Sequence, residues 1–125
     1  MYQKLLIVGN LGRDPELRYT PQGSPVATLS VATNRKRKDG DDSVCWFKVT
    51  VWGSQAEACN VYLSKGRQVL IEGELTPDPA TGAPRIWTRS DGTPGASFEV
   101  TASIVKFLQG GRELEPEPEQ EELPF

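Results

Sequence analysis

Histidine is absent from this sequence of 125 residues, and cysteine occurs only twice. Without histidine, the chain lacks the commonest general base and the commonest metal ligand, so the composition disfavours an enzyme. Cys45 and Cys59 are too few for a disulfide scaffold and do not have the spacing of a metal site. Cys45 alternates with apolar neighbours, so we expect it to be a small core side chain. We therefore predict neither a metal nor a cofactor.

Long apolar runs are also missing from the chain. No segment is long enough to span a bilayer, and the first residues do not form a signal-peptide pattern. Hydrophobic residues make up 37% and charged residues 25%, which is typical of a soluble globular protein. The length is sufficient for one domain with its own core. We expect a cytoplasmic protein that has no membrane partner.

The net charge of −3 is unevenly distributed along the chain. Residues 112–125 contain six glutamates and one arginine, a formal charge of −5, which leaves 13 basic and 11 acidic side chains on residues 1–111. A mildly basic body with an acidic appendage is compatible with a nucleic-acid partner, although the whole chain is acidic. Glycine and alternating glutamate and proline predict a short flexible tail at 109–125, after a domain at 1–108.

The most informative segment is the expected strand 45–52. Cys45, Phe47, Val49 and Val51 are apolar, and the residues between them are aromatic, cationic or polar. Successive side chains of a strand point to opposite faces, so one face can build a core while the other presents two indoles and a lysine. Such a face suits unpaired bases joined by phosphates. The alternative, two ordinary buried tryptophans, remains open on this segment alone.

The order of predicted elements indicates an all-β protein. Val26, Cys45, Gln68 and Phe98 begin alternating strands that end near residues 33, 52, 75 and 107, after a first strand at 4–11. A short extended piece is expected at 17–19 and a projecting hairpin around 85–89. This order matches a five-stranded Greek-key barrel, the OB-fold, with one short helix between strands three and four. A two-sheet β-sandwich is the alternative.

The single helix is expected to begin at Ser54 and end near Leu63. Ser54 and Glu57 have the spacing of a capping box, and Gly66 favours a stop. The helix should bury Cys59, Tyr62 and Leu63. In the last strand, alternation predicts one shared face for four apolar residues: Phe98, Val100, Ala102 and Ile104.

The first strand contains Leu5, Leu6, Ile7 and Val8, which are apolar on both faces. Both faces of this strand should therefore be covered. Two arrangements satisfy this requirement. The protomer covers both faces itself, or its own core covers one and a second copy of the chain covers the other.

Four segments together resemble one family. Residues 7–19 (IVGNLGRDPELRY), 46–53 (WFKVTVWG), 62–66 (YLSKG) and 71–75 (IEGEL) are similar, in order, to motifs of bacterial single-stranded DNA-binding proteins. The last residues, 121–125 (EELPF), resemble the acidic-Ile-Pro-Phe tip of that family. The resemblance implies an OB-fold protomer, usually a homotetramer, which binds unwound DNA with little sequence preference. It also implies a bacterial protein of DNA replication, recombination and repair, associated with the nucleoid.

Residue roles are carried over from the resemblance by position. Trp46, Trp52 and Trp87 match positions that stack on bases, with Trp52 where many members have phenylalanine. Arg37 stands where many members have another tryptophan, so stacking by its guanidinium is one possibility. The resemblance and the local basic patterns predict contacts with phosphates for the following residues: Lys4, Arg18, Arg35, Arg37, Lys48, Lys65, Arg85 and Arg89. For each cation alone, a solvated surface charge is the alternative.

The end of the chain predicts a docking peptide for replication and repair proteins. Phe125 supplies an apolar anchor, Glu121 and Glu122 supply negative charge, Pro124 limits the conformations lost on docking, and Leu123 lies between them. The same acidic charge is able to compete with DNA for the basic surface.

Two other functions are compatible with the sequence. One is an OB-fold module that prefers RNA or acts mainly as a protein adaptor, because an aromatic face does not exclude a 2′-hydroxyl. The other is a metal-dependent nuclease that uses Asp39, Asp41 and Asp42. Those carboxylates lie at a loop tip, so we favour a DNA-binding protein that is not an enzyme.

Overall fold

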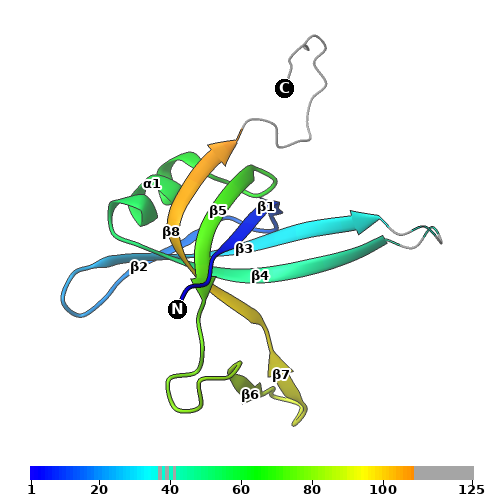
Figure 1. Ribbon diagram of the computed structural model, residues 1–125. Helices are drawn as coiled ribbons and strands as arrows, with labels where there is room; N and C mark the ends of the chain where they lie inside the picture. The colour runs from blue at the N-terminus through cyan, green and yellow to red at the C-terminus, as the bar shows by residue number, and fades with distance from the viewer. Residues whose placement is uncertain (37, 39, 41, 109–125) are drawn as a thin grey trace.

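The computed structural model describes residues 1–36, 38, 40 and 42–108 and consists mostly of β-strands (Figure 1). Arg37, Asp39, Asp41, the acidic segment 109–125 and its tip 121–125 lie outside the described residues. The described elements, in chain order, are β1 (Leu5–Leu11), β2 (Glu16–Tyr19), β3 (Pro25–Lys36), β4 (Asp42–Trp52), α1 (Ser54–Tyr62), β5 (Gln68–Leu75), β6 (Ile86–Thr88), β7 (Pro94–Ala96) and β8 (Phe98–Leu108). No helix in this part of the chain has the length and apolar character needed to cross a membrane.

Five strands close into a barrel. Their order is β1-β5-β8-β4-β3, and β1 pairs with β3 as well, through Asn10 opposite Ala32 and Leu11 opposite Val31. The pairing of β4 with β8 is parallel, and the other pairings in the barrel are antiparallel. β2 extends the wall at the outer edge of β3. The OB-fold, with one helix between the third and fourth barrel strands, is therefore confirmed.

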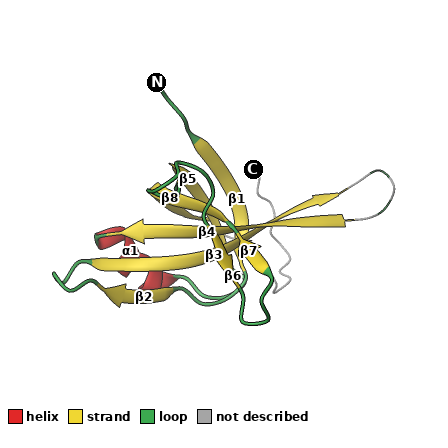
Figure 2. Cartoon of the chain, turned by 90° about the horizontal axis from the view of Figure 1, so that it is seen from below, coloured by secondary structure: helices red, strands yellow, loops and turns green. Residues whose placement is uncertain are grey.

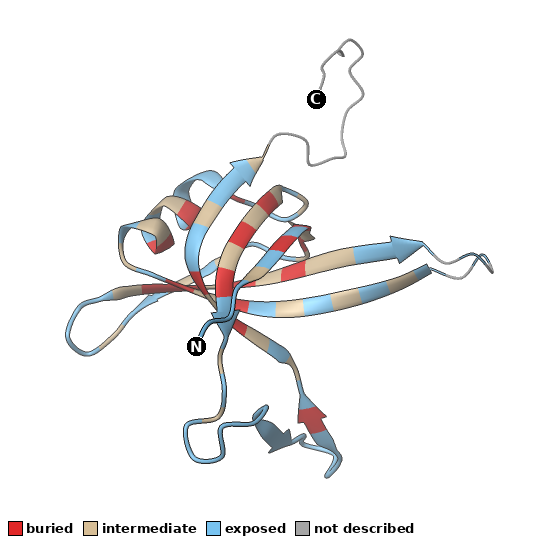
Figure 3. Ribbon diagram, viewed as in Figure 1, coloured by how far each residue is buried: buried red, intermediate tan, exposed pale blue. Residues whose placement is uncertain are grey.

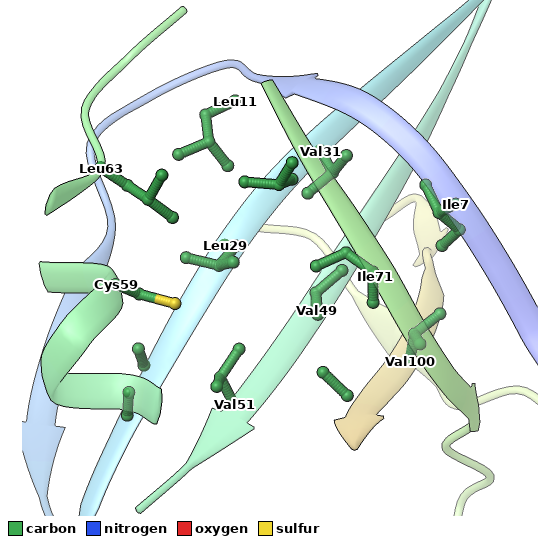
Figure 4. Packing of buried hydrophobic residues seen from close by; sticks show 14 residues of the cluster. Ile7, Leu11, Leu29, Val31, Val49, Val51, Cys59, Leu63, Ile71 and Val100 are labelled. Atoms are coloured by element: carbon green, nitrogen blue, oxygen red, sulfur yellow. The ribbon is translucent and has the colours of Figure 1, made fainter. Parts of the chain in front are cut away.

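The core lies inside this barrel and is capped by the helix. Alternate residues of β3, β4 and β5 point inward, as the buried bands along the strands show (Figure 3). The largest fully buried side chains include Leu29, Ile71 and Val49 (Figure 4). Cys59 of α1 joins this cluster, and burial raises the pKa of its thiol to about 11. Cys59 therefore remains a neutral, apolar packing residue at physiological pH.

The start of α1 differs from the predicted capping box. Gly53 is the N-cap, with φ 76° and ψ −149°, and no side chain caps the helix. Ser54 is already the first helical residue, because β4 runs directly into the helix and only glycine takes that left-handed turn without strain. Glu57 instead accepts a hydrogen bond from the Tyr19 hydroxyl at 3.2 Å, which ties α1 to β2. Figure 2 shows the helix beside β2 and β3, against which it packs.

The buried side of α1 is also partly different from the prediction. Ala56 and Cys59 are buried, and Leu63 follows them into the core. Tyr62, which was expected to be buried, is 63% exposed and packs on Phe107 with ring centroids 6.1 Å apart. Leu63, not Tyr62, continues the buried row of Ala56 and Cys59, so the Tyr62 ring lies outside the barrel core.

β8 contains an irregularity that alternation does not predict. Glu72 lies opposite Ile104 and Gly73 opposite Ala102, so Ser103 is an extra residue between them. This bulge reverses the alternation, and Ile104 points outward although it was expected to share the face of Val100. Gln55 of α1 holds the bulge: its Nε2 donates to the Ser103 carbonyl at 3.0 Å and its Oε1 accepts from the Val105 N–H at 2.9 Å.

At the start of β8, before the bulge, Phe98 shares the face of Val100 and Ala102, as alternation predicts. Phe98 is 60% exposed, at the point where β8 leaves the β6–β7 hairpin, and its ring packs on Phe47 with centroids 5.9 Å apart. Cys45 is only partly buried. Among the described residues, β8 pairs with β4 only from Phe47 onward, so Cys45 lies in the part of the β3–β4 hairpin that extends beyond the barrel.

Candidate nucleic-acid interface

The outward face of β4 is open to solvent. Trp46 is 51% exposed and Trp52 49% exposed, with Lys48 between them, while Val49 and Val51 on the other face are completely buried. The alternation predicted from the sequence is therefore confirmed, and the alternative of two buried indoles is excluded. The two rings are six residues apart, or about 20 Å along an extended strand.

A groove of about 510 Å³ lies over one half of this face. Its floor is formed by Trp46 and Lys48 of β4 and by Ser30 of β3. One wall comes from the β1–β2 loop, where Gly12 is held to β3 by a hydrogen bond from its N–H to the Ser30 carbonyl at 2.9 Å. The groove therefore combines an aromatic ring, a cation and polar backbone groups.

The opposite wall comes from the β6–β7 hairpin, which projects from the barrel (Figure 1). Trp87 lines the groove from β6, with Ala96 and Ser97 beside it. Trp87 is 38% exposed, and it shares the groove with Trp46 although the two are far apart in the sequence. The structure thus brings together two of the three predicted stacking residues.

Trp52 lies outside this groove, at the other end of the same face. In the register of β2, β3 and β4, Arg18, Val26 and Trp52 are neighbours in one row. Val26 is only 2% exposed yet is not part of the core cluster, which indicates that its neighbours on the outer face cover it. Arg18 also donates from Nη1 to the Thr28 hydroxyl at 3.1 Å. An indole and a guanidinium thus form a second platform.

Two predicted phosphate-binding cations are already paired. The Lys4 Nζ lies 3.0 Å from Glu72 Oε1, and the Arg85 Nη2 lies 2.6 Å from Glu99 Oε2. In each case the hydrogen bond to the carboxylate, followed by its charge, raises the pKa of the cation. The Arg85 pair joins the foot of the hairpin to β8. These two residues therefore have structural partners, and any contact with phosphate competes with the ion pair.

The remaining predicted cations are distributed around the interface. Arg89 donates to the Thr93 hydroxyl and to the Pro94 carbonyl within the hairpin. Arg35 is exposed near the end of β3, in the extended hairpin arm, and Lys65 is exposed after α1, with its backbone N–H donating to Asp14. Contact of each with DNA remains a prediction.

Arg13 lines the groove although neither the motifs nor the basic patterns of the sequence indicated it. It lines the groove from the β1–β2 loop, facing the region of Trp46 and Lys48. Glu16 lines the same groove and partly offsets its charge. The signal for Arg13 was its place two residues after the strand that ends at Leu11, because loops at the end of a barrel strand surround the binding face of this fold.

The nuclease alternative receives no support from the described residues. Outside positions 37, 39 and 41 and the segment 109–125, no three His, Cys, Asp or Glu side chains gather where they could hold a metal ion. Asp42 is exposed at the start of β4, opposite Lys36.

The groove lies where an OB-fold binds its ligands. Its parts are the outward face of the second and third barrel strands, the loop after the first strand, and the hairpin inserted between the fourth and fifth. This arrangement is typical of OB-fold modules that bind oligonucleotides or oligosaccharides. Residues 2–108 match the model of the Single-strand binding protein family, and the chain belongs to this family.

Curated relatives are similar over most of the chain. The single-stranded DNA-binding protein of Wolinella succinogenes is 42% identical over 125 aligned residues, which cover 92% of this chain and 73% of the relative. That of Helicobacter hepaticus is 40% identical, covering 86% of this chain and 62% of the relative. That of Thermotoga maritima is 38% identical, covering 86% of this chain and 74% of the relative. The chain thus matches between 62% and 74% of the length of these three relatives.

Proposed function

We propose that this protein binds single-stranded DNA without sequence preference and protects it. The observation that carries the proposal is the groove in which Trp46 and Trp87, from separate elements, are exposed beside Lys48. The names of the relatives support the same ligand. No catalysis is involved, and we place the protein in the cytoplasm, on DNA of the nucleoid.

The mechanism follows from stacking and charge. An exposed indole stacks on any base, at about 1–3 kcal/mol per base, because every base has a π-face. Cations add a term that depends on salt, since each phosphate they neutralise releases counterions. Neither interaction contacts base edges, so affinity does not depend on sequence. A duplex hides its base faces, which explains a preference for single strands.

Titration with oligo-dT tests this function. We expect strong quenching of tryptophan fluorescence and an affinity that falls with salt, with a log–log slope of about −0.7 for each phosphate neutralised. A matched oligo-U tests the RNA alternative, and a mixed-sequence DNA tests sequence preference. Equal or tighter binding of the RNA would favour the RNA-binding module, and absence of quenching with every oligonucleotide would favour a protein adaptor.

We also propose that the protomer assembles into a homotetramer, with the outer apolar patch as one of its interfaces. This patch consists of Leu6, Val8, Leu70 and Ile104. Leu6 is 60% and Val8 48% exposed, so the protomer itself covers only one face of β1. Val8 lies directly opposite Leu70 in the register, and Leu6 and Ile104 lie on the two sides of Glu72, so all four side chains share the outer face. Contiguous exposed apolar side chains of this kind mark interaction surfaces.

For the tip at 121–125 we propose docking to replication and repair proteins. The sequence supports this role by combining Phe125 and its neighbouring carboxylates with Pro124. A partner with an apolar pocket and a basic rim fits this chemistry. The role of the anchor can be tested with two synthetic peptides, EELPF and EELP. We expect the peptide with the phenylalanine to bind a candidate partner more tightly than the peptide without it.

Removal of residues 112–125 is expected to tighten oligo-dT binding at low salt. The deletion removes six glutamates and one arginine, and with them a formal charge of −5 that competes with DNA for the basic surface. The difference should disappear at high salt, because screening weakens the competition. A full-length variant with the six glutamates changed to glutamine is the matched control for length. Unchanged affinity of both variants at low salt would contradict the competition.

A further inference from the structure

The β6–β7 hairpin contains one buried residue in an otherwise exposed surface. Every residue from 79 to 96 is exposed except Gly95, which is buried, as the single buried band on β7 shows (Figure 3). Glycine has no side chain to bury, so the burial comes from what lies on its backbone. Trp87 is its partner across the two strands.

Trp87 and Arg89 occupy the space that a side chain at position 95 would need. A Cβ atom on Gly95 would lie 2.8 Å from Trp87 Nε1, 2.9 Å from Trp87 Cε2 and 3.1 Å from Arg89 Cζ. Arg89 is held there by its hydrogen bonds to Thr93 and Pro94. The indole therefore lies directly on the bare Cα of Gly95, and the guanidinium lies beside it.

Trp46 lies on a glycine in the same way. A Cβ atom on Gly12 would lie 2.5 Å from both Cη2 and Cζ3 of the Trp46 ring. Neither Gly12 nor Gly95 is among the glycines with positive φ, so backbone conformation does not require glycine at either position. Space for the indole is the remaining structural requirement. Both tryptophans that line the groove thus have a glycine beneath them.

We propose that Gly12 and Gly95 are positioning residues for nucleic-acid binding, which hold the Trp46 and Trp87 rings at their places in the groove. The proposal rests on the proposed function. A ring already held in place loses less freedom when a base stacks on it, so pre-organisation contributes to affinity. Residues 79–96 bury no side chain around the ring, so we expect the contact with Gly95, with Arg89 beside it, to restrict Trp87.

Gly95→Ala tests the proposal without risk to the fold, because the hairpin forms a sheet separate from the barrel core. The added methyl displaces the indole, and we expect oligo-dT affinity to fall by roughly threefold or more, up to the loss caused by Trp87→Ala itself. Ser90→Thr adds one methyl at an exposed position of the same hairpin and should bind as the wild type does. Gly12→Ala, compared with Trp46→Ala, repeats the test at the other ring.

A double-mutant cycle separates positioning from a general structural effect. If Gly95 acts through Trp87, Gly95→Ala has no further effect in the Trp87→Ala background. A wild-type affinity of Gly95→Ala, or an equal loss in both backgrounds, would overturn the proposal.

A fluorescence measurement on the protein without DNA distinguishes the positioning role of Gly95 from the proposed DNA-binding function. In a variant with Trp46 and Trp52 changed to phenylalanine, Trp87 is the sole tryptophan, since the chain has three, and its emission is excited selectively at wavelengths that tyrosine does not absorb. Gly95→Ala should then red-shift its emission and lower its anisotropy. Unchanged emission and anisotropy of Trp87 would refute the positioning role of Gly95, even if the wild-type protein binds oligo-dT strongly. A protein that fails to bind any oligonucleotide but shows these changes would refute the proposed function alone.

Discussion

Trp46→Ala is expected to weaken oligo-dT binding by roughly five- to 150-fold, which corresponds to the loss of about 1–3 kcal/mol for one stacked base. The ring is half exposed on the groove floor, so its removal creates no cavity in the core. Stability should therefore change little, and the thermal midpoint separates a lost contact from a lost fold. The affinity should be measured by the fluorescence anisotropy of labelled oligo-dT, because the variant lacks one of the tryptophans whose quenching reports binding.

Tyr62→Ala is the matched control for this substitution. Tyr62 is an aromatic residue of similar exposure, at the end of α1 and outside the groove lining. Its replacement should leave affinity unchanged. The salt dependence of Trp46→Ala should also remain that of the wild type, since the cations are intact. Wild-type affinity of Trp46→Ala would show that bases do not stack there and would remove the main support for the groove as the DNA site.

Leu6→Gln combined with Val8→Gln is expected to abolish one interface of the proposed homotetramer. Both side chains are exposed in the protomer, so the substitutions remove intermolecular apolar contact without opening the core. A tetramer with two kinds of interface should fall to dimers, and to the 13.8 kDa protomer if this interface is the only stable one. Light scattering after gel filtration measures the mass directly, across a range of protein concentrations.

Val61→Gln provides the control for the assembly. Val61 is 69% exposed on α1 and lies outside the outer apolar patch. This substitution tests whether the loss of apolar surface elsewhere on the protomer also changes the mass of the assembly. Binding of a short oligo-dT to one protomer should survive the double substitution, because the groove is formed within a single chain. An unchanged mass for the double variant would refute the patch as an interface.

The sequence predicted the fold and the open face of β4 because both depend on local alternation. Trp46, Lys48 and Trp52 had to share a face once the strand was recognised, and inward valines fixed which face was outward. The meeting of Trp46 with Trp87 depends instead on how the hairpin leaves the barrel, which no local pattern encodes. The pairing of Arg85 with Glu99 is equally non-local. The resemblance indicated Trp87 as a candidate stacking residue, and only the fold shows that it lines the same groove as Trp46.

The wrong predictions have physical reasons that local rules do not contain. Alternation assumes an unbroken strand, so the bulge at Ser103 reversed the faces beyond it and moved Ile104 outward. The capping-box pattern at Ser54 is not used, because β4 continues to Trp52 and Gly53 becomes the N-cap of the helix. Tyr62 is exposed because Ala56, Cys59 and then Leu63 form the row that enters the core, and Tyr62 lies beside that row.

The way the hairpin joins the barrel has a consequence for how such proteins diversify. Its two ends meet at a hydrogen-bonded base, where the Thr76 N–H donates to the Glu99 carbonyl at 2.8 Å and the hydroxyls of Thr76 and Thr101 are 2.6 Å apart. Everything beyond this base is outside the closed wall. We therefore expect natural or engineered changes in the length and composition of this arm to alter the groove, and with it ligand binding, while the barrel stays intact.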